Sequence, residues 1–120
     1  MPEPTSTPSS AFPYATHLNV LFAPLETIAL DPLVAAVRDR WYNQTLARVN
    51  ESVVRLGVVQ GEYHWHKHDD DDEFFFVVEG RFLIDLPDRM IELEPGQGVV
   101  VPKGTMHRPR APERTVILMV

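Results

Sequence analysis

Apolar and polar residues alternate along most of the second half of the chain. This period of two begins near residue 45, and it is typical of strands that bury one face. Turn-forming residues such as Gly80, Pro95–Gly96 and Lys103–Gly104 separate the alternating segments. Many short strands bounded by turns favour a sandwich or a barrel over parallel βαβ units. We predict strands at 45–49, 52–59, 73–79, 81–86, 90–94, 98–102, 106–110 and 115–120.

Two local features refine this all-β prediction. Asn50–Glu51 separates the first two strands and predicts a hairpin turn between them. Pro109 lies inside its short segment, and because proline has no N–H to donate, we expect an edge strand or a bulge there.

The pattern before residue 45 is helical instead. Asp31 suits the N-cap of a helix and Pro32 its first position. The apolar residues Leu33, Val34, Val37 and Trp41 would then form one stripe. Residues 1–13 are rich in Pro, Ser and Thr, so we expect a flexible arm over residues 1–16. A single domain should follow over 17–120, with the barrel at about 41–120.

Composition narrows the classes of function. The formal net charge of −6 makes nucleic acid and anionic membranes poor partners. Cysteine is absent, which excludes disulfides and thiolate ligands. The sequence has no apolar run of membrane-spanning length and does not begin like a signal peptide. We therefore expect a cytoplasmic protein that acts on a small molecule.

Candidate chemistry gathers in the stretch GEYHWHKHDDDDE, residues 61–73. In a strand, the alternating His64, His66 and His68 would share one face, and Tyr63, Trp65 and Lys67 would point the other way. Two such imidazoles can bind one metal ion, and Glu73 could add a carboxylate. The alternative is a surface strand with solvated histidines. The residues alone leave open whether the pair is His64 and His66 or His66 and His68.

The neighbouring residues suggest simpler roles. We expect the four aspartates of 69–72 to form a solvated loop. Phe75 and Val77 share the face of Glu73 and should help to wall a cavity, with Phe74, Phe76 and Val78 on the opposite face. Arg81 and Asp85 could orient a polar substrate if their face is interior, and are otherwise exposed to solvent. Trp41 and Trp65 are expected to serve packing or dimer contacts.

Two ordered motifs in the second half resemble those of the cupin superfamily. The first, G(x)5HxH(x)3–4E(x)6G, is matched by His66, His68, Glu73 and Gly80, with Gly61 one residue closer than the pattern asks. The second, G(x)5PxG(x)2H(x)3N, is matched by Gly96, Pro102, Gly104 and His107, with Ala111 in place of the final Asn. The short separation, residues 81–95, resembles that of small single-domain bacterial cupins.

The resemblance implies a jelly-roll β-barrel and one divalent transition metal ion: Fe, Mn, Ni, Co, Cu or Zn. It implies that the ligands are His66, His68, Glu73 and His107. His64 then lies outside the ligand set, either as a base behind the ligands or as a polar residue near the mouth of the site. Such a set would leave one or two positions of the metal free for a substrate or water.

We consider three functions for a protein with this ligand set. The first is a metal-dependent enzyme on a small oxygenated molecule, with dioxygenase chemistry favoured over isomerase or lyase chemistry by analogy within the superfamily. The second is a non-catalytic metal-binding or ligand-binding sensor. The third, a metal-free sugar isomerase or epimerase, fits poorly with an intact ligand set. We also expect a homodimer, formed through Phe74, Phe76 and the terminal segment 115–120.

Overall fold

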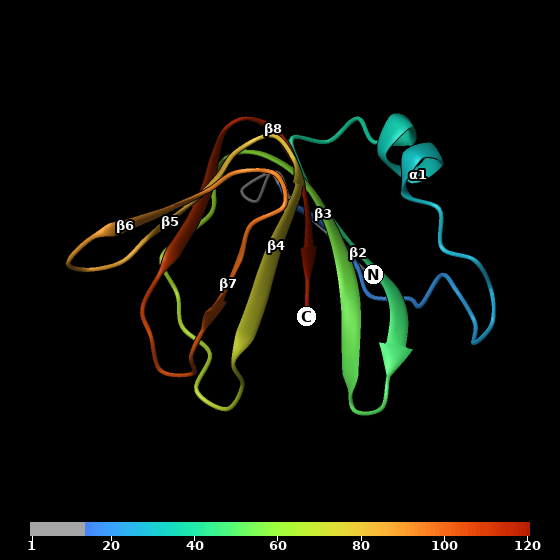
Figure 1. Cartoon of the computed structure of the whole chain (residues 1–120), viewed down its shortest axis with the longest axis horizontal. Coiled ribbons are helices and arrows are strands. Elements are labelled where there is room, and N and C mark those ends of the chain that lie inside the picture. The colour runs from blue at the N-terminus through green and yellow to red at the C-terminus, as the bar shows by residue number, and fades with distance from the viewer. Residues whose placement is uncertain (1–13) are drawn as a thin grey trace.

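The computed structural model describes residues 14–120, which form a curved, mostly β-strand structure with one short helix (Figure 1). The predicted hairpin is present, because the chain turns at Asn50, where φ is 53°. These findings confirm the all-β prediction for the second half of the chain. The elements are β1 (Tyr14–His17), α1 (Leu30–Ala36), β2 (Trp41–Val49), β3 (Ser52–Glu62), β4 (Glu73–Glu79), β5 (Phe82–Asp85), β6 (Met90–Leu93), β7 (Gly98–Val101) and β8 (Arg108–Met119).

Strand β8 is the centre of the sheet. The strand order is β1-β2-β3-β8-β4-β7, and the β5–β6 hairpin joins through the pairing of β5 with β8. In Figure 1, β8 passes over the top of the molecule and ends between β3 and β4. The β1–β2 pair is parallel, and the other pairs are antiparallel.

Irregular pairing bends this sheet. Val59 pairs with Thr115 and Gly61 with Ala111, so the short segment 112–114 of β8 bulges out of the ladder. Bulges bend and twist a strand, and this one lets the two halves of β8 lie in different parts of the fold. The two segments predicted at 106–110 and 115–120 are therefore one long strand. Pro109 lies where β8 pairs in register with β5, and its carbonyl also accepts the N–H of Tyr63 (2.9 Å). The expected edge strand or bulge is therefore absent at Pro109, and the bulge of β8 lies at 112–114 instead.

Both faces of the β2–β3–β8 layer are buried. Along β3, Val59 belongs to the inner hydrophobic cluster, together with Phe75 and Ile117. Leu56 and Val58 belong to a second, outer cluster. Residues of α1 and of the segment that precedes it cover this outer cluster: Phe22, Leu30, Leu33 and Val34. The strands therefore lie between the inner hydrophobic cluster on one face and the outer cluster, covered by α1, on the other.

The helix is shorter than its sequence pattern indicates. Its N-cap is Ala29, without a side-chain cap, and Asp31 lies in the first turn, so the predictions for Asp31 and Pro32 were wrong. The helix ends at Ala36, and Trp41 begins β2 with its side chain in the inner cluster. No helix within residues 14–120 is long and apolar enough to span a membrane.

The N-terminal boundary also differs from the prediction. Tyr14, Ala15 and Thr16 were assigned to the arm, but they pair with β2 as part of β1. A parallel pairing of this kind cannot be recognised from so short a segment. The remainder of the predicted arm, residues 1–13, lies outside the described residues.

Gly80, which closes the first motif, lies where the chain leaves β4 and touches β8. Its φ is 92°, and a Cβ atom added there would lie 2.5 Å from Oγ1 of Thr115. The Thr115 side chain is fully buried, and its hydroxyl accepts the N–H of Arg81 (3.0 Å). Glycine is needed at this position for two reasons, the positive φ and the close approach of β8.

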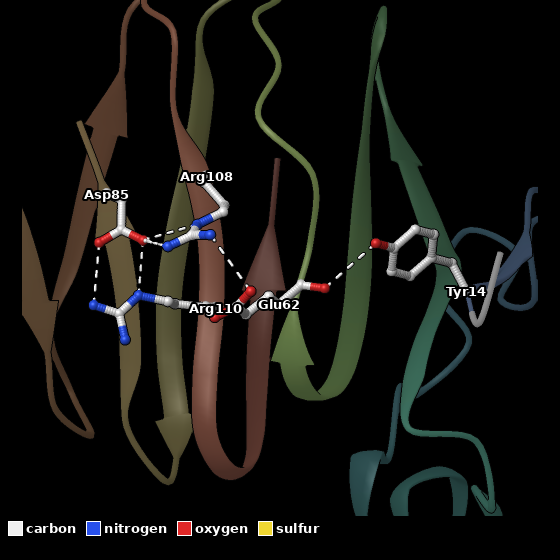
Figure 2. Close-up of polar contacts among 5 residues, drawn as sticks. All are labelled: Tyr14, Glu62, Asp85, Arg108 and Arg110. Carbon is white, nitrogen blue, oxygen red and sulfur yellow. Dashed lines mark hydrogen bonds and ion pairs between the residues drawn. The ribbon is translucent and has the colours of Figure 1, made fainter. Parts of the chain in front are cut away.

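A cluster of charges ties β5 to β8 (Figure 2). Asp85 on β5 accepts hydrogen bonds from Nε of Arg110 (2.7 Å) and Nε of Arg108 (3.0 Å). Arg108 also reaches the carboxylate of Glu62 (3.4 Å), and the hydroxyl of Tyr14 donates to the backbone carbonyl of Glu62 (3.3 Å). The hydrogen bond from Arg110, followed by that from Arg108, lowers the pKa of Asp85 even though burial raises it. The carboxylate of Asp85 is therefore bound by two arginines of β8 within the fold.

The other charged residue of this region, Arg81, is not a cavity residue either. Its guanidinium donates to Glu92 on β6 at 2.7 Å, and both side chains are about two-fifths exposed, at 42% and 40%. The exposed alternative is therefore correct for Arg81. Trp65 is also largely exposed, and the guanidinium of Arg108 lies 5.5 Å from its ring centre.

The surface expected to form a homodimer differs from the prediction in one part. Phe74 and its register partner Val100 are exposed on the outer face of β4 and β7. In contrast, Val116, Ile117 and Met119 of the terminal segment are buried within the chain. These three side chains cannot supply an interface, and the homodimer itself stays a prediction.

We predict that Gly80→Ala destabilises the fold more than Gly96→Ala. Gly96 has a similar φ of 85°, but a Cβ there would meet nothing within 4 Å. Gly96→Ala should lower the free energy of unfolding by about 1 kcal/mol through the positive φ alone. Gly80→Ala should lower it by about 2–4 kcal/mol, because overlap with β8 adds to that cost. Urea denaturation measures the free energy of unfolding of both variants. Equal losses would show that β8 moves away at Thr115 at little cost in free energy.

Asp85→Asn should make the protein less stable in a pH-dependent manner. Because the pKa of Asp85 is lowered in the folded protein, its stabilising contribution is complete above the unfolded-state pKa of about 3.9. That contribution is lost as the pH falls through the folded-state value. The difference between wild type and variant should be about 1–3 kcal/mol near pH 7 and should shrink below about pH 4. Urea denaturation at several pH values measures it.

Glu92→Gln is the control for this experiment. It breaks the exposed ion pair with Arg81. Because water already solvates both side chains of this pair, the substitution should change the free energy of unfolding little at any pH. A loss for Asp85→Asn that stays constant down to low pH would contradict the role given to the carboxylate charge.

Candidate metal centre

Backbone hydrogen bonds join the two motif-bearing segments. The N–H of His66 donates to the carbonyl of His107 (3.0 Å), and the N–H of His107 donates to the carbonyl of His66 (2.9 Å). The N–H of Gly104, whose φ is 80°, donates to the carbonyl of His68 (2.7 Å). Apart from this isolated bridge at His66, residues 63–72 form no strand, so the strand predicted for the histidines was wrong.

The four predicted ligands lie together despite the missing strand. One donor atom from each of His66, His68, Glu73 and His107 lies within 4.8 Å of the others. Oε1 of Glu73 is 3.2 Å from Nε2 of His68 and 3.7 Å from Nε2 of His107. The His107 side chain is almost fully buried and that of Glu73 largely so, whereas His68 lies at the mouth of the site.

Backbone carbonyls orient two of the imidazoles. Nδ1 of His66 lies 2.9 Å from the carbonyl of His64, and Nδ1 of His107 lies 2.8 Å from the carbonyl of Thr105. A carbonyl can only accept, so Nδ1 carries the proton in both rings. Nε2 is then left with a free lone pair in the neutral ring, which is the form that binds a metal ion.

The environment also sets the charges of the cluster. Burial lowers the pKa of His66, which keeps that ring neutral. Burial raises the pKa of Glu73, but the adjacent His107 and the positive charges around the carboxyl group lower this pKa by more. The carboxylate is therefore ionised. Burial lowers the pKa of His107, and the carboxylate of Glu73 and the carbonyl of Thr105 raise it by more. A metal ion would compete with a proton on His107.

Buried polar atoms without partners mark this centre. Among the described residues, three buried side-chain N or O atoms have no hydrogen bond: Oε1 of Glu73, Nε2 of His107 and Nε of Arg55. Buried polar groups are nearly always paired in folded proteins, so three at one place call for an explanation. Oε1 and Nε2 each offer an electron pair, and one cation could satisfy both. The residues therefore fit the metal that the motif implies.

A cavity of about 230 Å³ opens beside the cluster. His64 lines this cavity but does not belong to the four-residue group. Its ring stacks on Tyr63 with centroids 4.1 Å apart, and it is the carbonyl of His64, not its ring, that orients His66. Phe75 lines the cavity as expected, and the side chain of Phe74 lies outside.

Several cavity residues were not identified from the sequence. Tyr63 was expected to point away from the histidines, but it lines the cavity because the chain is not a regular strand there. Trp41 was assigned to a helix, and Asn43 and Arg55 were not considered. For Arg55 a signal existed. It alternates with Gly57 and Val59 along β3, but the opposite face carries Val54, Leu56 and Val58 and is also apolar, so the alternation does not identify the inner face.

The aspartate loop is exposed, as predicted, but one member has a structural contact. Oδ1 of Asp72 accepts the N–H of Lys103 (2.9 Å), which fixes the second motif's turn against the loop that precedes Glu73. Asp69 pairs with the side chain of Lys67 (3.2 Å), and both groups are well exposed. The loop is therefore solvated along most of its length and anchored at its end.

Comparison with known proteins agrees with the fold and the cluster. A model of the cupin domain matches residues 53–120, more than half of the chain. The chain belongs to the cupin family. This cupin is 45% identical over 85 residues to the uncharacterized protein YdbB of Bacillus subtilis (strain 168), a match that covers 70% of this chain and 75% of that protein.

Solved structures of other cupins resemble this one. A cupin-2 domain containing protein from Shewanella frigidimarina NCIMB 400 has a TM-score of 0.73 at 35% identity, covering 77% of this chain and 90% of that chain. Protein NMB1881 from Neisseria meningitidis has a TM-score of 0.64 at 32% identity, covering 78% and 97%. The predicted family and cupin fold are thus confirmed, and the cupin carries a His/His/Glu/His cluster typical of metal sites.

Proposed function

We propose that this cupin binds one divalent transition metal ion through His66, His68, Glu73 and His107, and uses it to act on a small oxygenated molecule. The observation that carries the proposal is the meeting of two buried atoms without a hydrogen bond, Oε1 of Glu73 and Nε2 of His107, in a group whose donor atoms lie within 4.8 Å. Three imidazoles and one carboxylate suit Fe, Mn, Ni, Co, Cu or Zn.

The metal ion, when bound, would act as a Lewis acid that polarises a substrate oxygen or water. The chain's own residues prepare the site for this chemistry. The carbonyls of His64 and Thr105 hold the lone pairs of His66 and His107 toward the cluster. Phe75 and Phe82 line the cavity with buried aromatic surface that limits water near the cluster. The cavity volume favours a small molecule over a polymer.

The reaction type is proposed by analogy alone. Dioxygenase chemistry comes first, and isomerase or lyase chemistry second, because a metal with free positions beside a cavity supports each of them. A cupin that binds a metal or a ligand without turnover is the alternative from a different class. A cytoplasmic location is consistent with the acidic composition and the absence of cysteine.

We predict that the purified protein, incubated with each of the six candidate ions and then desalted, retains about one equivalent of at least one of them. His66→Ala and His107→Ala should retain little, because each removes a neutral nitrogen ligand. The metal-loaded wild type should unfold at a higher temperature than the stripped protein, because a ligand of the folded state stabilises it. Elemental analysis and thermal unfolding measure the two effects.

His64→Ala is the matched control. It removes a histidine from the same segment but keeps the backbone carbonyl that orients His66, so the metal content should match that of wild type. If wild type retains none of the ions, or if the His66 and His107 variants retain as much as wild type, the proposed metal site is wrong.

Oxygen uptake separates the proposed functions. Metal-loaded wild type should consume oxygen with at least one member of a panel of catechols, β-diketones and hydroxy acids, and His107→Ala should not, because it lacks the metal. An oxygen electrode with product analysis measures the reaction. Full metal content without oxygen uptake would exclude the dioxygenase reading for this panel, and unchanged compounds would favour the binding alternative.

A further inference from the structure

Arg55 brings a positive charge to the interior of the barrel. Along β3 it shares a face with Gly57 and Val59, both of which are buried, and Val59 belongs to the inner hydrophobic cluster. Its register partners are Thr45 on β2 and Met119 on β8, so it lies in the middle of the sheet. The side chain is 32% exposed and lines the cavity beside the metal centre.

A metal ion cannot explain the unpartnered Nε of Arg55. Glu73 and His107 each present a lone pair to the cluster, but Arg55 presents an N–H donor, which needs an acceptor. Within the described residues, its one ion pair joins Nη2 to Oε2 of Glu73 at 3.8 Å, which is too long for a hydrogen bond. The guanidinium thus has donor capacity to spare next to the cavity.

Asn43 adds a second polar group on the same wall. It lies on β2 opposite Gly57, the neighbour of Arg55 along the inner face of β3, and it lines the cavity. No side-chain hydrogen bond of Asn43 occurs in the part of the chain that the structure describes. An amide without a hydrogen bond and a guanidinium whose one ion pair is long form a polar patch in a cavity whose other walls are largely aromatic and apolar.

The charge of the cavity favours an anion. Apart from its histidines, the cavity lining holds one cationic side chain, Arg55, and one carboxylate, Glu73, and their charges offset each other. A divalent ion at the cluster would leave the cavity with a net positive charge. A carboxylate matches the planar fork of an arginine and can accept two hydrogen bonds from it.

We propose that the cavity binds a small carboxylate with a flat apolar body, an inference that rests on the metal-binding function proposed above. The carboxylate accepts hydrogen bonds from Arg55 and Asn43. The flat body lies against Trp41, Phe75 and Phe82, each at most 5% exposed in the free protein. Because Nη2 of Arg55 is 3.8 Å from a ligand residue of the cluster, a molecule held by Arg55 places its body beside the metal.

The competing role for Arg55 is purely structural. Its guanidinium could serve only to hold Glu73 in place, and in that case Arg55 is a positioning residue of the metal site. The two roles differ in what a substitution changes. Loss of an anion-binding residue weakens carboxylate binding and leaves metal content intact, whereas loss of a positioning residue lowers metal content first.

The experiment compares benzoate with benzamide, its neutral analogue of the same shape, by isothermal titration of the metal-loaded full chain. Benzoate should bind about tenfold more tightly or better. Arg55→Met should lower benzoate affinity about tenfold or more and leave benzamide affinity unchanged, because only the anion uses the guanidinium. Arg55→Lys, which keeps the charge without the fork, should fall between. Arg48→Met, at an exposed arginine of β2, should behave as wild type.

Three outcomes would overturn the inference. In the first, benzoate and benzamide bind wild type equally well. In the second, benzoate binds Arg55→Met as tightly as wild type and binds only when the metal is present, which would mean that the carboxylate binds the ion instead of Arg55. The third is loss of metal from Arg55→Met in elemental analysis, which would make Arg55 a positioning residue. If Arg55→Met fails to fold, Asn43→Ala decides: a selective loss of benzoate affinity supports the inference, and an equal loss for both compounds overturns it.

The same titration separates this inference from the metal-binding proposal. If wild type binds no metal, that proposal fails. Benzoate binding by the metal-free protein that still depends on Arg55 would nevertheless support a carboxylate site. If wild type binds metal and Arg55 has no effect on benzoate, the metal site stands and the carboxylate site is wrong.

Discussion

The site depends on one pair of backbone hydrogen bonds, the mutual bridge between His66 and His107. The two residues are far apart in sequence, and the segment 63–72 has no regular ladder to hold it in place. Because the bridge fixes both main chains, it also fixes the carbonyls near them that orient the two rings. The turn at Gly104 and the carboxylate of Asp72 extend this junction on either side. A side-chain cluster of this kind is therefore a consequence of main-chain pairing.

Strand β8 carries that junction into the rest of the fold. It begins immediately after His107, pairs first with β5 and β3, and ends between β3 and β4. The bulge at 112–114 allows one strand to serve both regions. Asp85 secures the first half of β8 through two arginines, and Gly80 allows close contact at Thr115. The charged residues of β5 and β8 thus support the barrel from outside the cavity.

Unsatisfied polar groups distinguish the cavity from the core around it. The inner cluster is apolar, so a charge on its surface is costly unless it is paired. Here two lone-pair donors and one N–H donor meet without partners. A cation would satisfy the two lone pairs and a hydrogen-bond acceptor would satisfy the N–H, and the two proposals above rest on this difference.

The sequence by itself determined the β-strand class and most strand positions, because period-two patterning is a local property. The set of four candidate ligands came from the resemblance to the cupin motifs, since the residues alone left two histidine pairs open. The sequence pattern placed Trp41 on the helix, since the helical period runs on past Ala36 where the chain in fact changes direction. It placed the N-cap at Asp31 because Asp suits that position, but the helix begins at Leu30, one residue before Asp31.

Only the tertiary structure decided that Arg55 faces the interior and that Asp85 does not reach the cavity. The physical reason is that β3 is buried on both faces. α1 and the segment before it cover the side carrying Leu56 and Val58, so alternation along β3 cannot say which face is the barrel interior. Which face of β3 lies inside depends on what packs against each face, and the residues of the strand alone do not determine this.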